Sequence, residues 1–252
     1  MPDEREPFAL ARFDQADLER WLVEALMRET PEENLFATLD AAGCLPHGQA
    51  GRIDFRHMLS RASALSERVQ ALREGAIPQT LELDLALDGT RLTGRLQALT
   101  DSGLLAYTAG RFYPYELLAH WIRHLALNLA APAGIAPVTH LLEGERAGVL
   151  QPVEAPRDQL EILRHHYLLG HNRSLPFYPA TSWEYMTGLQ TGDEARALAN
   201  AIGKWDGNRH LAGDGEKPYN RLLWPQRSLF AEAFGDTAVT LLQPLIDHLE
   251  WH

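Results

Sequence analysis

The stretch LELDLALDGTRLTGRLQALTDSGLLAYTAGRFYPYELLAHWIRHLALNL, residues 81–129, decides the fold. Its opening alternates leucines with acidic or small side chains, which is the period of a strand with one buried face. Asp88-Gly89 supplies the pair that a tight two-residue turn prefers, because both turn positions need a positive φ. We therefore expect a hairpin with its second strand at 91–99, followed by a short apolar strand at 104–108.

After Ala109-Gly110 the apolar period changes to that of a helix. The expected order is thus three strands and then a helix that packs on them. Periodicity alone fits any α/β domain with a hairpin and a packing helix, so the fold family needs further evidence. The apolar stripe of this helix is Leu117, Leu118, Trp121, Ile122, Leu125 and Leu129.

Helical patterns flank this core on both sides, and one more hairpin is expected between residues 138 and 153. We expect helices at 14–30, 31–43 and 54–74 before the core, and at 156–170, from 181, at 191–203 and at 229–249 after it, the last interrupted at Pro244. The prediction is a single domain, residues 1–252, with a helical part at 1–77, a sheet core with its packing helix at 78–153 and a helical tail at 154–252.

The composition is that of a globular protein: 252 residues, 45% of them hydrophobic, are enough to bury a core. The net charge of −11 opposes non-specific attachment to a phosphate backbone, so any DNA contact must be local. Cys44 is the single cysteine, which excludes internal disulfides, thiolate zinc sites and an iron–sulfur cluster held by this chain. No apolar run is long enough to span a membrane, and we expect a soluble, cytoplasmic protein.

Several phrases spread over the chain carry a resemblance to a known family. In their order and spacing they are similar to the C-terminal domain of the exonuclease V gamma chain (RecC), a nuclease-like domain of the PD-(D/E)XK group. The resemblance implies a restriction-endonuclease-like α/β core with a mixed central β-sheet flanked by helices, plus helical N- and C-terminal extensions. The phrases are EPFAL at 6–10, LTGRLQAL at 92–99, GLLAYTAGR at 103–111, WIRHLAL at 121–127, LPFYPATSWEY at 175–185 and GDGEKPYNRLLWP at 213–225.

The resemblance also implies where a nuclease site would lie. Active members carry an aspartate on the second strand, and an acid and a lysine two residues apart on the third. The carboxylates hold Mg²⁺, and the lysine adds a fixed positive charge. The aspartate position falls here on Gln97, and the acid and lysine positions fall on Ala106 and Thr108. We therefore expect a nuclease-like scaffold with no catalytic residues, no metal and no other cofactor.

Two helices carry further positions at which active relatives use polar residues. On the helix before the sheet, His57 aligns with a histidine and Arg61 with an acid, although His57 also fits a plain surface histidine. On the helix after the sheet, Trp121 takes the place of a glutamine. These replacements add to the loss of the site that the resemblance implies.

The chain has 11 histidines, and some of them are spaced as metal ligands are. His120 and His124 are four residues apart on one helix, as a zinc pair is, and His165, His166 and His171 form a second group. Neither group brings further ligands, and no HExxH motif is present. We expect both groups to be exposed or to lie at an interface.

The most polar stretch of the tail is KWDGNRHLAGDGEKPYNRLLWP, residues 204–225. Lys204, Arg209, Lys217 and Arg221 alternate there with tryptophan and tyrosine, a combination that can contact phosphates and stack on bases. Acidic residues dilute the charge, however, and the glycines suit turns. The alternative interpretation is therefore a structural signature of the tail.

By this resemblance, the chain is a non-catalytic structural and interaction module of the exonuclease V helicase–nuclease, which acts in double-strand-break repair and recombination. Its partners would be the beta and alpha chains of that enzyme and duplex DNA. A patch made of Phe177, Tyr178 and Trp183 would suit such a partner if it were exposed. The alternative is an active Mg²⁺-dependent nuclease with metal ligands relocated to Glu82, Asp84 and Asp101.

Overall fold

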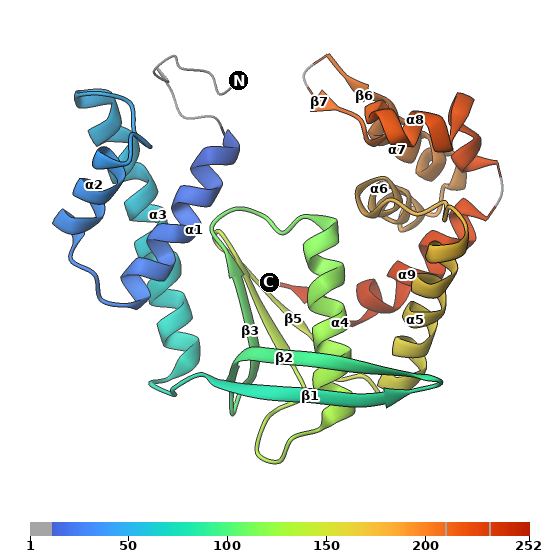
Figure 1. Cartoon of the computed structure of the whole chain (residues 1–252), viewed down its shortest axis with the longest axis horizontal. Coiled ribbons are helices and arrows are strands. Elements are labelled where there is room, and N and C mark those ends of the chain that lie inside the picture. The colour runs from blue at the N-terminus through green and yellow to red at the C-terminus, as the bar shows by residue number, and fades with distance from the viewer. Residues whose placement is uncertain (1–11, 210, 232) are drawn as a thin grey trace.

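The fold was read from a computed structural model that describes residues 12–209, 211–231 and 233–252. The phrase EPFAL at 6–10 lies outside these ranges. A central sheet joins a group of helices at the N-terminal end to a second group at the C-terminal end (Figure 1). The expected α/β class is confirmed, with a mixed sheet flanked by helices and helical extensions on both sides.

The main sheet has six strands in the order β1-β2-β3-β4-β5-β8. Among the described strands, β3 and β4 form the one parallel pair, because α4 (Pro114–Ala130) crosses over between them. The other neighbours pair antiparallel, which makes the sheet mixed. The strands are β1 (Gln79–Leu87), β2 (Thr90–Thr100), β3 (Gly103–Thr108), β4 (Thr139–Glu143), β5 (Arg146–Leu150) and β8 (Leu249–Trp251).

The β1–β2 hairpin has the expected two-residue turn, since Leu87 pairs with Thr90. The expected turn geometry is wrong in one respect: Gly89 has a φ of +69°, whereas Asp88 keeps a negative φ. Further along β2 the register shifts by one residue, and Ala98 there has a φ of +59°. This is a β-bulge, which bends a strand and ends its regular pairing.

The two faces of the sheet pack against different helices because side chains alternate along each strand. Leu105 of β3 and Leu142 of β4 belong to a core with α1 (Arg12–Met27), α2 (Glu32–Ala41) and α3 (Gln49–Arg73). Ala106 and Leu141, one residue away, face α4 and α5 (Pro156–Asn172) instead. The inner face of α3 thus covers one side of the sheet. This helix, predicted at 54–74, begins five residues earlier than expected, at Gln49.

A third core holds the C-terminal helices together, and its members include Trp205, Leu229 and Phe234. Phe177, Tyr178 and Trp183 are half-buried and pack against this core, so the condition of an exposed aromatic patch is not met there. The helices are α6 (Pro179–Leu189), α7 (Glu194–Asp206) and α9 (Phe234–His248), of which α9 begins five residues later than predicted. The stretch between α7 and α9 forms the ribbon β6–β7 (Gly207–Asn208, Leu211–Ala212), α8 (Pro218–Leu223) and two 3₁₀ turns (Asp214–Glu216, Pro225–Phe230).

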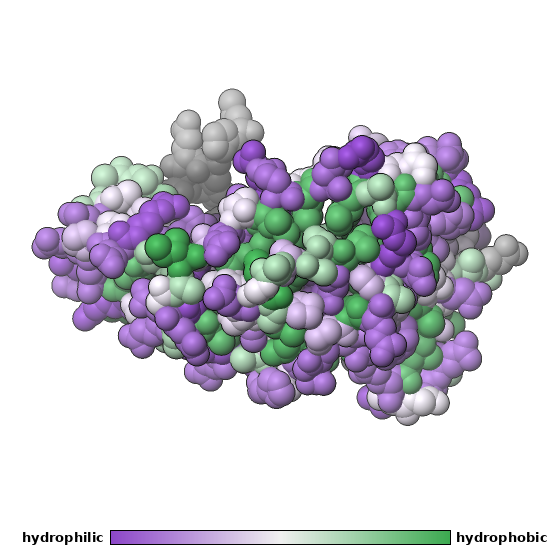
Figure 2. All heavy atoms as spheres, turned by 90° about the horizontal axis from the view of Figure 1, so that it is seen from below, coloured by the Kyte–Doolittle hydropathy of each residue, from purple (hydrophilic) through white to green (hydrophobic). Residues whose placement is uncertain are grey.

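The surface seen from below shows apolar residues reaching solvent over the middle of the molecule, with mostly hydrophilic residues towards both ends (Figure 2). Within the described ranges, no helix is both long and apolar enough to cross a membrane.

Candidate functional site

The three positions at which a nuclease would carry its ligands lie in different surroundings. Ala106 is only 7% exposed and packs under α4 in the same core cluster as Phe112 and Trp121. Thr108, two residues on, is half-buried and pairs with Glu143 of β4. Gln97 is exposed on β2, directly before the bulge at Ala98.

The structure brings Ala106 and Thr108 to one face of β3 but does not join Gln97 to them by strand pairing. The β2–β3 ladder is short, consisting of Leu99 with Leu104 and Thr100 with Gly103. Beyond this short ladder, the β1–β2 hairpin crosses β3 near its lower end in the view of Figure 1. The strands therefore diverge where a nuclease would gather its carboxylates.

A buried carboxylate that the sequence analysis missed lies beside Thr108. Glu143 ends β4 and is 4% exposed. Its Oε2 accepts the backbone N–H of Phe112 at 2.9 Å, and its Oε1 accepts Arg146 Nη1 at 2.9 Å. Both oxygens are therefore engaged in holding the loop before α4 to the β4–β5 turn. The signal in the sequence is an acid at the end of an apolar strand.

Arg68 of α3 fixes the same turn from the other side of the sheet. Its Nη1 donates to the carbonyl oxygen of Gly144, and its Nη2 donates to that of Arg146 at 2.9 Å. The guanidinium of Arg146 lies 4.4 Å from the centre of the Trp251 ring in β8. The region around Thr108 is thus closed by structural contacts from α3, β4 and β8.

The acids of the alternative nuclease hypothesis are exposed and paired with arginines of the neighbouring strand. Glu82 of β1 lies 2.7 Å from Arg95 Nε, and Asp84 accepts Arg91 Nε at 2.7 Å. The hydrogen bond from Arg91 holds the pKa of Asp84 below its usual value. Such cross-strand pairs stabilise a hairpin surface. Asp101 is exposed in the β2–β3 turn.

No group of three His, Cys, Asp or Glu side chains in the described part of the chain is arranged to hold a metal ion. Cys44 packs against the N-terminal core.

His124 contradicts the expectation that the histidine groups are exposed or at an interface. It is fully buried on α4, where Nδ1 lies 3.0 Å from Thr139 Oγ1 and Nε2 lies 2.9 Å from the carbonyl oxygen of Gln151. Burial lowers the pKa of His124 to about 4, and it does the same for half-buried His120. His124 is therefore a neutral core residue that ties α4 to β4 and to the end of β5.

We expect the free energy of unfolding to fall as the pH is lowered from about 6.5 towards about 4. The unfolded chain binds a proton at His124 near its ordinary pKa, whereas the folded chain resists protonation until about 4. The contribution of neutral His124 to the free energy of unfolding is therefore fully present above about pH 6.5. It is lost as the pH falls towards about 4, by at most about 1.4 kcal/mol per pH unit for one such group. Urea unfolding at several pH values measures this slope.

The control for this slope is an exposed histidine. His124→Gln should flatten the pH dependence, whatever stability it loses at pH 7. The same substitution at His57, which is exposed on α3, should leave the slope unchanged. Equal slopes in the two variants would contradict the role of His124.

Arg61, at the expected acid position on α3, forms an ion pair with Glu19 of α1, which is largely buried. This contact holds the first and third helices together. Trp121 is buried on α4, and its ring stacks near that of His124. Both residues therefore contribute to packing at the positions where active relatives carry polar groups.

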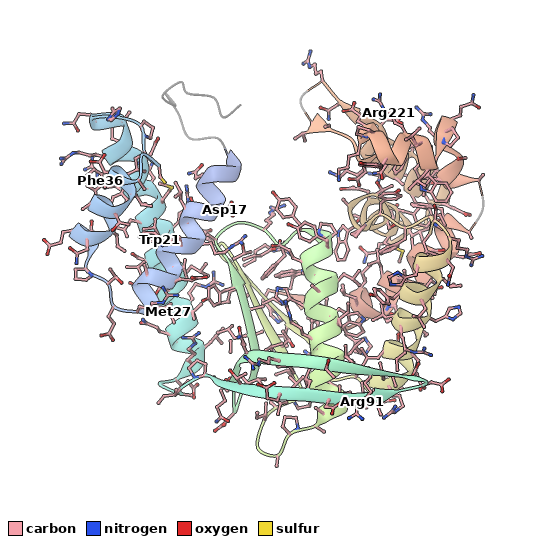
Figure 3. All side chains as sticks on the ribbon, in the orientation of Figure 1. Asp17, Trp21, Met27, Phe36, Arg91 and Arg221 are labelled. Atoms are coloured by element: carbon pink, nitrogen blue, oxygen red, sulfur yellow. The ribbon has the colours of Figure 1, made fainter. Side chains whose placement is uncertain are left out.

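The four predicted DNA-binding residues come from three segments of the C-terminal group. Lys204 is half-buried on α7, Arg209 is exposed at the β6–β7 turn, and Lys217 lies 3.6 Å from Asp214. Arg221 is exposed on α8, at the end of the molecule remote from the β1–β2 hairpin (Figure 3). Of the aromatic residues in this stretch, Trp205 is buried and Trp224 is half-buried, which leaves Tyr219 exposed.

Polar contacts give this stretch a structural role. Asp214 accepts Thr181 Oγ1 of α6 at 2.9 Å, and its backbone carbonyl accepts Asn220 Nδ2 at 2.7 Å. Tyr178 OH donates to Asn220 Oδ1 at 3.1 Å and accepts Trp224 Nε1 at 3.1 Å. The network supports the structural interpretation of the GDGEKPYNRLLWP phrase.

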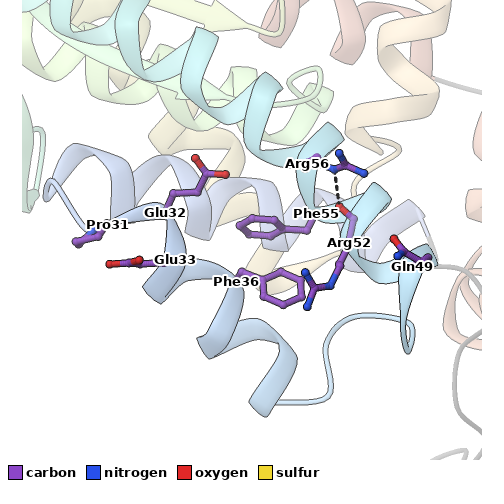
Figure 4. A pocket seen from close by; sticks show the side chains of 8 residues that line it. All are labelled: Pro31, Glu32, Glu33, Phe36, Gln49, Arg52, Phe55 and Arg56. Carbon is purple, nitrogen blue, oxygen red and sulfur yellow. Dashed lines mark hydrogen bonds between the residues drawn. The ribbon is translucent and has the colours of Figure 1, made fainter.

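A cavity of about 650 Å³ opens between α2 and α3. The rings of Phe36 and Phe55 meet edge to face at 5.2 Å, and the guanidinium of Arg52 lies 5.2 Å from the centre of the Phe36 ring. Figure 4 shows Glu32 on the other side of these rings from Arg52. This cavity between the N-terminal helices is thus lined by aromatic rings and by charges of both signs.

Comparison with known proteins identifies the family. The model of the RecC C-terminal domain matches residues 1–190. The chain is also 25% identical over 236 residues to the RecBCD enzyme subunit RecC of Escherichia coli (strain K12). That alignment covers 90% of this chain and 21% of the subunit, so the chain spans about a fifth of the length of this relative. With three quarters of its residues inside the family match, the chain belongs to the RecC C-terminal domain family.

Proposed function

We propose that the chain is a non-catalytic, nuclease-like module of a RecBCD-type exodeoxyribonuclease V, acting in double-strand-break repair and recombination in the cytoplasm. Its partners are the beta and alpha chains of that enzyme and the duplex DNA that the enzyme processes. Family membership supports the assignment to this machine, since the named relative is a subunit of the RecBCD enzyme.

The order of the core elements supports the PD-(D/E)XK assignment. An antiparallel meander of β1, β2 and β3 is followed by the helix α4 and by β4, which is parallel to β3. This order fits the mixed central sheet flanked by helices that the resemblance implies, and a helix precedes the meander as well.

The observation that carries the non-catalytic proposal is the chemistry at β3 and β4. Ala106 and Thr108 offer no carboxylate and no amine, and Ala106 is packed under Phe112. The nearby acid, Glu143, engages one oxygen with Phe112 N–H and the other with Arg146. A divalent ion needs several oxygen ligands, and Mg²⁺ in particular demands a well-ordered set. We therefore infer that this site does not activate water for phosphodiester hydrolysis.

Basic residues in the C-terminal stretch provide a local surface that can contact DNA. Lys204, Arg209, Lys217 and Arg221 lie in a stretch where positive charges exceed negative ones, within a chain of net charge −11. We infer contact with the phosphate backbone through Lys204 and Arg209, weaker than in a dedicated DNA-binding domain, because Lys217 is already paired with Asp214 and Arg221 lies among exposed apolar residues of α8.

Incubation of the purified chain with linear single- and double-stranded DNA in Mg²⁺ or Mn²⁺ tests the proposal. We expect no degradation above a metal-free control. Degradation that is abolished by Glu82→Ala or Asp84→Ala would instead establish the relocated metal site and overturn the proposal. Glu145→Ala, at an exposed acid in the β4–β5 turn, serves as the control substitution.

A further inference from the structure

The short helix α8 presents three large apolar residues to solvent. Tyr219, Leu222 and Leu223 are 80%, 79% and 51% exposed. Asn220 and Trp224, by contrast, face the third core and its polar network. This reverses the usual pattern of a surface helix, in which apolar residues face inward.

The reversed orientation is held by specific bonds. Asn220 Nδ2 donates to the carbonyl oxygen of Asp214 at 2.7 Å, and its Oδ1 accepts Tyr178 OH. Trp224 Nε1 donates to the same hydroxyl group, and its backbone N–H donates to the carbonyl oxygen of Asn220 at 2.9 Å. Because two inward side chains four residues apart are fixed, the outward residues are fixed as well. We call the surface of Tyr219, Arg221, Leu222 and Leu223 the α8 face.

The α8 face combines this apolar surface with positive charge. Among the described residues, no carboxylate lies within ion-pair distance of Arg221. Residues 204–227 carry five Lys or Arg against three Asp or Glu, whereas the chain as a whole is strongly acidic. A complementary surface therefore needs apolar side chains to cover the leucines and a carboxylate opposite the guanidinium.

We propose that the α8 face docks another protein of the RecBCD-type assembly, through an apolar surface that carries an acidic residue against Arg221. This rests on the proposed function for the identity of the assembly and adds the surface and its chemistry. Duplex DNA fits less well, because a polyanionic backbone pairs with arginine but offers nothing to cover Leu222 and Leu223. Tyrosine and arginine are enriched at the energetic centres of protein interfaces, and an exposed apolar patch marks an interaction surface.

Co-expression of the chain with tagged beta and alpha chains of such an enzyme tests the proposal. The wild-type chain should be retained on the affinity resin. Tyr219→Ser/Leu222→Ser should lower retention at least about tenfold, and Arg221→Glu should lower it in the same direction. The matched control is Tyr167→Ser/Ile77→Ser, at two apolar residues that are 68% and 85% exposed elsewhere, and it should retain wild-type binding.

The outcomes separate the two proposals. If the wild-type chain is not retained with the beta and alpha chains, both the assembly role and the docking surface are overturned. Full retention of the α8-face variants would overturn the docking surface alone. Concentration-dependent dimerisation abolished by these variants in sedimentation would assign the face to a second copy. DNA affinity lost on Arg221→Glu but kept in Tyr219→Ser/Leu222→Ser would assign Arg221 to DNA. Assignment of the face to a second copy and assignment of Arg221 to DNA each contradict the inference. Unchanged thermal unfolding confirms that the exposed substitutions leave the fold intact.

Discussion

Glu143→Ala is expected to lower the free energy of unfolding by about 3 kcal/mol. The substitution removes both acceptors that hold the α4 loop to the β4–β5 turn, since Oε2 binds Phe112 N–H and Oε1 binds Arg146. The buried amide of Phe112 loses its carboxylate acceptor, which accounts for about 1–3 kcal/mol. The side chain of Arg146 is 46% exposed, so water screens its share and keeps the total at the lower end of the range for a broken buried pair.

Urea unfolding followed by tryptophan fluorescence measures this loss. Glu145→Ala, two residues away in the same turn but exposed, should change the stability by less than about 0.5 kcal/mol. Glu143→Gln keeps one oxygen as an acceptor for Phe112 N–H and should fall between the two. Equal stabilities of the alanine variants would show that Glu143 is not a structural carboxylate, and would leave it free for another role.

Introducing nuclease ligands at Gln97, Ala106 and Thr108 is expected to destabilise the core without producing nuclease activity. Ala106→Glu places a carboxylate in the apolar cluster beneath α4, beside Phe112 and Trp121. Burial of an unpaired charge costs several kcal/mol, and the larger side chain adds overpacking, so we expect a loss of about 3–5 kcal/mol. Adding Gln97→Asp and Thr108→Lys should not restore Mg²⁺-dependent cleavage, because Gln97 lies beyond the end of the β2–β3 pairing.

Gln97→Asp alone is the control for this series. Gln97 is exposed, so its substitution should change stability by no more than about 0.5 kcal/mol. Differential scanning calorimetry of the single and triple variants, with a nuclease assay of each, gives the comparison. A triple variant as stable as wild type, or one that cuts DNA, would mean that the packing around Ala106 can accommodate a metal site.

The core of the fold follows from short-range patterns and could be predicted. The leucine alternation and the Asp88-Gly89 turn place β1 and β2 within two residues of their observed ends, and the stripe through Trp121 places α4. Strand β8 could not be found, because its three residues have no period of their own. It exists because the end of α9 delivers Leu249 and Trp251 to the edge of β5.

The site was predicted only in part, for a similar reason. Ala106 and Thr108 could be placed because positions two apart on a strand share a face. The role of Glu143 depends on Phe112, 31 residues earlier, and on the crossover that brings the two together. The bulge at Ala98 and the burial of His124 under β4 and β5 likewise arise from tertiary packing that no local pattern encodes.

The reversed helix α8 shows what the family resemblance leaves open. The GDGEKPYNRLLWP phrase was recognised, but only the hydrogen bonds of Asn220 and Trp224 reveal which of its residues point outward. The exposed apolar residues are therefore Tyr219, Leu222 and Leu223, while Phe177, Tyr178 and Trp183 are partly buried against the third core.

Binding of Mn²⁺ to the purified chain tests the central claim most directly. Electron paramagnetic resonance of the free ion counts bound Mn²⁺, with Glu143→Gln and Glu82→Ala/Asp84→Ala as comparison variants. The account predicts no saturable one-to-one binding at millimolar Mn²⁺, and identical titrations for all three proteins. A stoichiometric site that either variant abolishes would contradict it.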